Sequence, residues 1–382
     1  MKKIVALMLA LAMTASLAAC GSSSAPAETT AAAETEAAAA ETEAAAETEA
    51  AAAETEAAEA AADETAAADA GELVADEEGI TINICHASAE ETVLHRACVK
   101  YAELLNEYSG GAITATVYPN GSLFGVAEMN EAIKDGSTQV IAGSPGAMLS
   151  TSLGFFELPN TISSVEQAHE VMQDGHEFRT ILNGLFDEAG VRLQAIEPCD
   201  FRMLTSNKEV KNFSEINGLK IRVMDSEIPM SYWAQWGAQP TPIAWPEVYM
   251  SLQQNKVDAQ ENPYDSILGS NLQEVQKYII DTRHVMFYTA FMMNKGFYEA
   301  RTDNMKAIID KAANDAAAFA YQDALDSSAA NRQKLEDAGM TFIEFTQDDW
   351  DQMRANATEA DEKITASIGE DLFGQLMGAL GL

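Results

Sequence analysis

The chain of 382 residues predicts an α/β protein, and three features of the sequence support this fold class. Beyond residue 79, short segments with the period-two alternation of strands take turns with segments of helical period. This succession is typical of a mostly parallel sheet covered by helices. Residues 303–337 contain neither Gly nor Pro and are rich in Ala, which predicts one long helix. The length is sufficient for two domains.

The individual elements follow from the spacing of apolar residues and from the Gly and Pro residues that end each segment. In the first half we expect strands at 81–85, 113–118 and 138–142, and helices at 93–105 and 126–134. In the second half we expect strands at 219–223, 287–293 and 341–345, helices at 247–255, 271–278 and 303–337, and further helices from residue 347.

The strand at 219–223 carries a candidate binding residue. Leu219, Ile221 and Val223 alternate with polar positions, so Arg222 stands on the opposite face of a stiff element. A guanidinium held in this way suits a carboxylate, because its N–H donors match the two oxygens. An Arg in a surface ion pair is the alternative.

The formal net charge of −37 is unevenly distributed. Residues 21–79 contain 17 acidic and no basic residues, in a low-complexity background of Ala and Thr. Such a segment has too little apolar bulk to bury a core, so we expect an acidic tether. Nucleic acid is excluded as a partner, because binding phosphate requires clustered Lys and Arg. Any site for an anion must therefore use local Arg side chains and backbone donors.

The N-terminus predicts export. Lys2 and Lys3 precede an apolar run at 4–15, which is too short for a transmembrane helix. Leu17-Ala18-Ala19-Cys20 then resembles a bacterial lipobox, in which Cys20 is lipidated and becomes the mature N-terminus. An ordinary signal peptide with an incidental Cys is the alternative. We expect residues 1–20 to be a lipoprotein signal peptide, which places the protein outside the cytoplasm and anchored to the cell membrane.

Several short motifs together resemble one known family. In chain order they are Asn217-Gly218-Leu219-Lys220-Ile221-Arg222-Val223, Gly237-Ala238-Gln239-Pro240-Thr241-Pro242, Glu247-Val248-Tyr249, Leu252-Gln253 and Val257-Asp258-Ala259-Gln260-Glu261-Asn262-Pro263. They are similar to the signature of the solute-binding subunits of tripartite ATP-independent periplasmic (TRAP) transporters, of the C4-dicarboxylate-binding type. Tyr118 to Leu123 and Phe156-Glu157-Leu158-Pro159 extend the resemblance to the first half.

The resemblance implies a two-lobed, periplasmic-binding-protein-like fold with a ligand cleft between the lobes and a long helix crossing both. The first lobe would comprise residues 80–199 and 288–327, and the second residues 200–287 and 328–382. In this family a carboxylate ligand is held by an Arg on the strand that here contains Arg222, with a second Arg and an Asn. The positions that match these and the other cleft-lining residues of the family are Arg222, Arg202, Asn262, Trp245, His86 and Ser144. Packing between the lobes would also explain Trp245.

One departure from the family bears on the ligand. Sialic-acid-binding relatives have acidic residues where this chain has Val126 and Ser144. The resemblance therefore favours a smaller or more apolar acid over a polyhydroxylated one.

The function implied is that of an extracytoplasmic solute-binding protein, not an enzyme, which captures a small organic acid and delivers it to a TRAP membrane permease for ion-coupled uptake. We expect a monomer without a cofactor. No metal is expected either, because the five His residues lack metal-binding spacing. Cys85, Cys98 and Cys199 form no Cys-x-x-Cys pair, so buried thiols or a single bridge are expected. A ligand-binding partner of a sensor kinase or chemoreceptor is one alternative. A lipid-anchored hydrolase is another, disfavoured because the sequence shows no set of a nucleophile and a base and no Gly-x-Ser-x-Gly motif.

Overall fold

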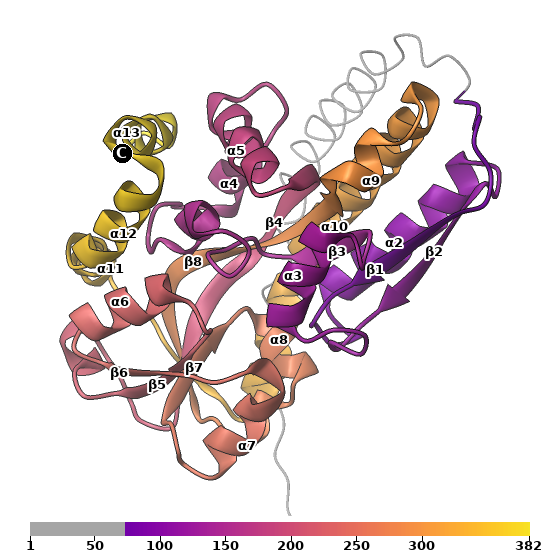
Figure 1. Cartoon of the computed structure of the whole chain (residues 1–382). Helices are drawn as coiled ribbons and strands as arrows, with labels where there is room; N and C mark the ends of the chain where they lie inside the picture. Colours follow the sequence, from indigo (N-terminus) through magenta and orange to yellow (C-terminus); the bar gives the residue numbers. More distant parts are fainter. Residues whose placement is uncertain (1–72) are drawn as a thin grey trace, which may run out of the picture. The chain divides into compact units, whose positions relative to one another are not determined.

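The structure is a computed structural model that describes residues 73–382 (Figure 1). The predicted signal peptide, the lipidation site at Cys20 and nearly all of the predicted tether lie outside these residues. No helix in the described part of the chain is long and apolar enough to cross a membrane.

One mixed sheet contains all the strands of the described residues, in the order β2-β1-β3-β8-β4-β7-β5-β6, with β9 paired to β8. The strands are β1 (Ile80–Cys85), β2 (Ile113–Tyr118), β3 (Val140–Gly143), β4 (Val191–Ser206), β5 (Lys220–Val223), β6 (Gln239–Pro242), β7 (Ala259–Asn262), β8 (Tyr278–Asn294) and β9 (Thr341–Ile343). At one end β2, β1 and β3 are parallel, and at the other β7, β5 and β6 are parallel.

The two long strands β4 and β8 join these ends. They are antiparallel to each other over 16 and 17 residues, and β8 pairs with β3 while β4 pairs with β7. Their register shifts at three places, the last of them between Arg202 and Leu204. Such irregularities bend and twist a strand pair, so one pair can serve two differently oriented halves. Figure 1 shows β1 and β2 on one side of the molecule and β5, β6 and β7 on the other.

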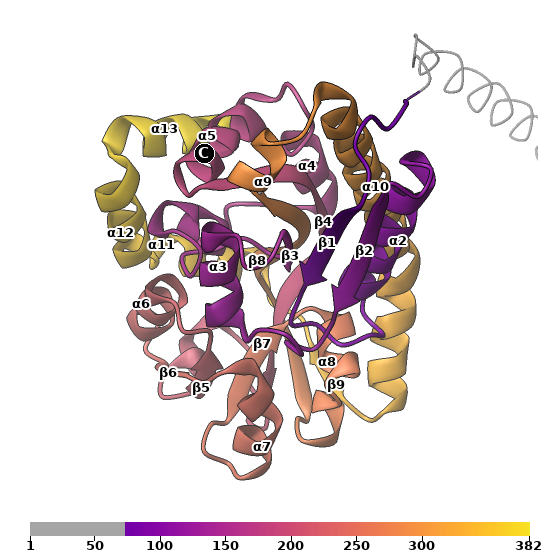
Figure 2. The same ribbon diagram turned by 45° about the vertical axis from the view of Figure 1, so that its right-hand side comes forward.

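Helices cover both faces of the sheet (Figure 2). The α-helices are α2 (Val93–Tyr108), α3 (Val126–Asp135), α4 (Val165–Val171), α5 (Glu177–Glu188), α6 (Glu227–Gln235), α7 (Val248–Gln253), α8 (Tyr264–Gly269), α9 (Lys295–Glu299), α10 (Asp303–Asp337), α11 (Gln347–Ala355), α12 (Thr358–Ile368) and α13 (Glu370–Ala379). Short 3₁₀ helices are η1 (Thr151–Glu157), η2 (Phe213–Ile216), η3 (Trp245–Glu247) and η4 (Leu272–Glu274).

The long helix α10 has the bounds that its composition predicts. Thr302 caps its first turn by accepting a hydrogen bond from the backbone N–H of Met305. Its buried face consists largely of alanines, which let the helix approach α2 and β4 closely. It also packs on α8, at the other end of the sheet, and so crosses both halves of the fold. The predicted two-lobed α/β fold with a long crossing helix is thus confirmed.

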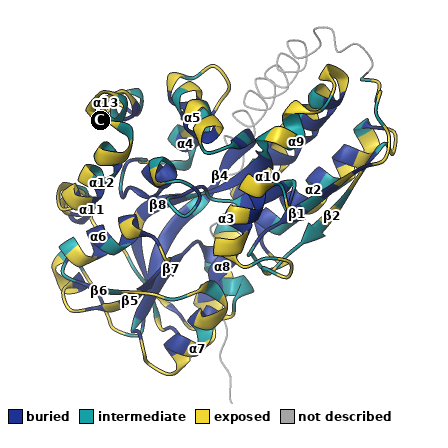
Figure 3. Ribbon diagram, in the orientation of Figure 1, coloured by how far each residue is buried: buried dark blue, intermediate teal, exposed yellow. Residues whose placement is uncertain are grey.

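Two buried hydrophobic clusters stabilise the molecule. One joins residues of β1, α2 and the first half of α10, and the other contains β5, α6, α5 and the C-terminal helices. Residues of β4 and β8 contribute to both clusters, because successive side chains of a strand point to opposite faces. Figure 3 shows this central strand pair as buried and the outer faces of the helices as exposed.

The prediction of a helix at 271–278 was wrong. Only the short turn η4 forms there, and β8 already begins at Tyr278. Asn271 has a left-handed backbone conformation (φ 55°), which does not continue a helix. The buried Gln276 side chain accepts a hydrogen bond from Thr205 Oγ1 and donates one to the Asp258 carbonyl, so tertiary contacts fix the segment.

Ordered contacts begin earlier than the predicted first strand. Leu73 and Ala75 pack against the hydrophobic cluster around β1, and Glu77 pairs with Arg301 at 2.7 Å. At the other end of the chain, α12 contacts both η1 and α6, and α13 packs on α5. The predicted division into lobes would separate α13 from α5, and the lobe boundaries stay a prediction.

Candidate functional site

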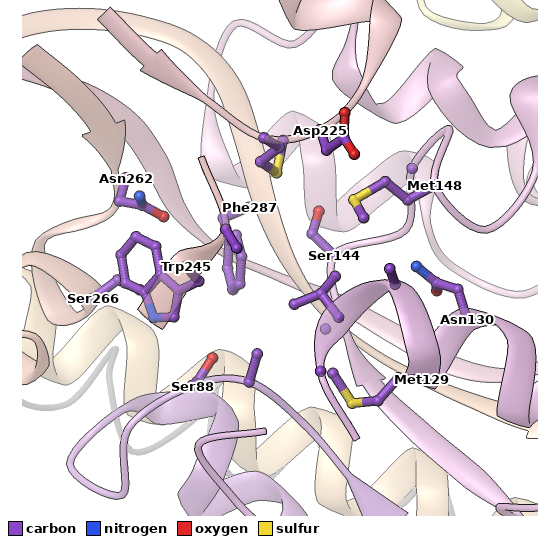
Figure 4. A pocket seen from close by; sticks show the side chains of 18 of the residues that line it. Ser88, Met129, Asn130, Ser144, Met148, Asp225, Trp245, Asn262, Ser266 and Phe287 are labelled. Atoms are coloured by element: carbon purple, nitrogen blue, oxygen red, sulfur yellow. The ribbon is translucent and has the colours of Figure 1, made fainter. Parts of the chain in front are cut away.

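A cavity of about 610 Å³ lies between the two halves of the fold. Its walls come from the segment after β1, from α3 and the loop after β3, and from β4, β5, β7 and β8. Figure 4 shows Asn262, Trp245 and Ser266 on one side of the cavity and Ser144, Met148, Met129 and Asn130 on the opposite side. Residues from distant parts of the sequence therefore meet around one space.

Arg202 lies in β4 and lines the cavity, but its guanidinium is paired within the chain. Its Nε donates to Glu261 Oε2 at 2.5 Å, and one terminal nitrogen donates to Glu261 Oε1 at 3.0 Å and to the Glu261 carbonyl at 2.8 Å. Both residues are buried, and the antiparallel pairing of β4 with β7 brings them together. His284 Nε2 lies 3.2 Å from the same carboxylate.

This pairing determines the charge of Glu261. Burial alone would raise the pKa of the carboxyl, but the Arg202 guanidinium and the His284 hydrogen bond hold it at about 2. Burial would lower the pKa of Arg202, but the Glu261 carboxylate raises it. Both groups are therefore ionised, and this bidentate pair is a fixed part of the cavity wall.

Arg222 lies in β5 with its side chain on the cavity wall and is 4% exposed. Its Nε donates to the Ile243 carbonyl at 2.9 Å, and its guanidinium carbon lies 5.5 Å from the centre of the Trp245 ring. Within residues 73–382 no carboxylate pairs with it, in contrast to Arg202. Burial lowers the pKa of Arg222 to about 10, so the side chain is a cation at neutral pH. The surface ion pair considered from the sequence is not what the structure shows.

Asn262 ends β7, opposite Met203 of β4, and is buried on the cavity wall. Its amide nitrogen donates to Gln260 Oε1 at 2.7 Å, and Gln260 in turn donates to Thr205 Oγ1. This chain of bonds fixes the orientation of the Asn262 amide. Trp245 and Ser144 are half-buried and also line the cavity.

His86 is the one predicted site residue that the structure does not bring to the cavity. It is fully buried, and its Nε2 lies 3.1 Å from His95 Nδ1. Burial lowers the pKa of His86 to about 4, so the ring is neutral. The cavity is instead lined by the residues that follow it, Ala87, Ser88 and Ala89.

Sequence reasoning missed Glu157, a buried acid in the cavity wall. It accepts hydrogen bonds from Ser226 Oγ at 2.5 Å and from the backbone N–H of Ala147 at 3.2 Å. Burial raises its pKa to about 7, although these two donors and the Arg202 charge oppose the shift. A Cβ at Gly146 would overlap with this carboxyl, which explains the glycine. An acid within the apolar run Phe155-Phe156-Glu157-Leu158 was the signal available.

The cysteines and the possible metal ligands of the described residues form no second candidate site. Cys85, Cys98 and Cys199 are free and buried, as expected for thiols without a bridge. Among residues 73–382, no group of three or more His, Cys, Asp and Glu side chains could hold a metal ion.

Comparison with known proteins places this fold and cavity in a class. Residues 84–367 match the model of the bacterial extracellular solute-binding protein family 7. A solute-binding protein of Roseobacter denitrificans is 29% identical over 77% of this chain and 88% of its own. The C4-dicarboxylate-binding periplasmic protein DctP of Rhodobacter capsulatus is 27% identical over 79% of this chain and 91% of its own.

A solved structure of the Roseobacter denitrificans protein, described as a TRAP periplasmic solute-binding protein with bound L-galactonate, gives a TM-score of 0.71. The match covers 80% of this chain and 99% of that structure, with 26% identity. The fold and its interior cavity thus define an extracytoplasmic solute-binding protein. The chain belongs to the bacterial extracellular solute-binding protein family 7, which confirms the resemblance to TRAP solute-binding subunits.

Proposed function

We propose that the protein captures a small organic acid in the cavity and delivers it to a TRAP membrane permease for ion-coupled uptake. The observation that carries this proposal is Arg222, a buried cation on the cavity wall for which residues 73–382 supply no carboxylate. A ligand carboxylate would compensate that charge with bidentate hydrogen bonds, and the fixed amide of Asn262 would support it. The two relatives described above bind acids, which agrees with this proposal.

The cavity also suggests how binding and delivery are coupled. We propose that residues 80–199 with 288–327 and residues 200–287 with 328–382 close on the ligand as two lobes, since both sides contribute to its walls. A smaller radius of gyration in solution scattering when the ligand is present would agree, and an unchanged radius would count against closure.

We further propose that lipidated Cys20 anchors the protein and that the acidic segment after it is the tether; of the predicted range 21–79, the last residues already pack on the folded part through Leu73, Ala75 and Glu77. The sequence Leu17-Ala18-Ala19-Cys20 supports this proposal. Mass spectrometry of the mature N-terminal peptide should show a diacylated Cys20. A mature chain that begins at another residue without lipid would refute it.

Calorimetric titration of the full chain with carboxylates, in the wild type and in Arg222→Lys, tests the proposal that Arg222 binds a ligand carboxylate. Lys keeps the charge but loses the planar fork, so we expect at least a tens-fold weaker affinity, where a factor of ten is about 1.4 kcal/mol. The control is Arg332→Lys, a half-exposed Arg that pairs with Glu336 and Glu344 outside the cavity. Equal affinity in wild type and Arg222→Lys would remove Arg222 from the site.

A further inference from the structure

We infer that the ligand is a monocarboxylate with an apolar body, whose far end carries at most a neutral hydrogen-bonding group. The inference rests on the proposed function, because it takes the Arg222 end of the cavity as the carboxylate site. Three observations carry it: the charge of the lining, the apolar wall opposite Arg222, and the amide of Asn130.

The basic end of the cavity has one buried positive charge that pairs with no carboxylate of the described residues; Asp225 also lines the cavity, but it is exposed and pairs with neither Arg. Two guanidinium groups, those of Arg202 and Arg222, face one ionised carboxylate, that of Glu261. These two Arg residues are the only Lys, Arg or His side chains among the described residues that line the cavity. One ligand carboxylate completes the balance of charge. A second carboxylate would be buried without a counter-charge, which is costly in a low-dielectric site.

The side opposite Trp245 likewise supplies no cationic side chain for a second carboxylate. There the buried Glu157 accepts from the N–H of Ala147, next to Met148, so any charge it carries is negative. The N-terminus of α3 also borders the cavity, but the Glu128 carboxylate accepts from the N–H of the N-cap residue Gly125 at 3.0 Å and places a negative charge beside the N–H groups of Val126 and Ala127. A dicarboxylate would therefore place its second charge near acids.

The far wall is largely apolar. Met129 and Met148 lie in it, and Figure 4 shows Phe287 between these residues and Trp245. The cavity lining also includes Ile141, Leu149 and Met292. Apolar and aromatic bodies gain from burial against such side chains, and the flexible Met residues adapt to their shape. A sugar acid would instead bury most of its hydroxyl groups against methyl and methylene groups, because Ser88, Asn130 and Ser144 can pair with only some of them, and each unpaired hydroxyl carries a cost.

Asn130 is, with Ser144 and Glu157, one of the polar residues among these apolar side chains. It is 8% exposed and lines the cavity beside Met148 (Figure 4). Its amide is not among the buried side-chain atoms without a partner in the described residues, so it is accessible from the cavity. A neutral hydroxyl, carbonyl or amide of the ligand is a suitable hydrogen-bond partner for it.

A matched set of acids tests the inference by calorimetric titration of the full chain. Benzoate, 4-hydroxybenzoate, phenylacetate and 4-methylpentanoate are compared with terephthalate, succinate and galactonate. We expect at least one apolar monocarboxylate to bind about ten-fold or more tightly than every diacid and sugar acid. Tighter binding of a diacid or a sugar acid would overturn the inference while the proposed function stands. Failure of every acid to bind would remove the proposed function, and this inference with it.

Two variants sharpen this test through ratios, which do not depend on the folded fraction. Met148→Lys supplies the missing cation, so the affinity for terephthalate relative to benzoate should rise about ten-fold. Met250→Lys adds the same charge at an exposed position of α7 outside the cavity lining and should leave the ratio unchanged. Asn130→Leu should lower the affinity for 4-hydroxybenzoate relative to benzoate about five-fold. Unchanged ratios in both cavity variants would contradict the inference.

Discussion

Arg202 and Arg222 lie on the wall of one cavity, are buried to the same extent and each face an aromatic ring, yet their surroundings differ. Arg202 is about 5.9 Å from the Phe287 ring centre and pairs with Glu261 through two nitrogens. Arg222 is 5.5 Å from the Trp245 ring centre and pairs with no carboxylate of the described chain. The chain thus compensates one buried cation itself and supplies no carboxylate among the described residues for the other. We therefore expect the first to contribute to stability and the second to binding.

The largest effect should come from breaking the compensated pair. Arg202→Met leaves the Glu261 carboxylate buried with only His284 beside it, so we expect a loss of about 3–5 kcal/mol in the free energy of unfolding. Urea denaturation measures it, and the double variant Arg202→Met/Glu261→Gln should recover much of the loss. A loss below about 1 kcal/mol would show that the pair is not a stabilising unit.

Arg222→Met should separate binding from stability. We expect affinity for the carboxylate to fall more than 100-fold, or by about 2.7 kcal/mol, because the ligand loses its counter-charge. The free energy of unfolding without ligand should stay the same or rise by about 1 kcal/mol, because burial disfavours the charged form of this side chain. Titration and denaturation of the same sample measure both. Destabilisation as large as that of Arg202→Met would abolish the distinction between the two residues.

The fold could be predicted from the sequence better than the difference between the paired Arg202 and the unpaired Arg222. Alternation at 219–223 placed Arg222 correctly on a strand, and the Ala-rich segment predicted α10 to the residue. The pairing of Arg202 with Glu261, 59 positions away, depends on the register between β4 and β7, which local patterns do not encode. The lengths of β4 and β8 were missed because buried polar residues such as Thr282 and His284 interrupt the apolar runs.

The position of His86 shows a further limit of prediction from the sequence. The resemblance predicted that His86 lines the cleft, but in the structure its neighbours Ala87 and Ser88 line the cavity instead. Successive residues after a strand point in different directions, so a match that is accurate to one residue does not settle which side chain faces the ligand.

The smallest expected effect is the dependence of ligand affinity on pH, which arises because Glu157 titrates near the unpaired charge of Arg222. Burial raises the pKa of Glu157 to about 7, and the groups around it are Ser226, the Ala147 N–H, Arg202 and Glu261. Below this pH the carboxyl is neutral. Above it the carboxylate offsets part of the positive charge at Arg202 and Arg222 and repels the ligand, so affinity should fall about two- to five-fold between pH 6 and pH 8.

Glu157→Gln keeps a neutral side chain of the same shape at every pH and should flatten this dependence. Titrations of wild type and variant at pH 6, 7 and 8 measure it, with a monocarboxylate whose own charge is constant over that range. An affinity that rises with pH in the wild type would reverse the sign and show that Glu157 does not act on the ligand as a like charge. An equal fall in both proteins would assign the titration to another group. A fall confined to the wild type would show that Glu157 sets how much of the Arg222 charge remains for the ligand.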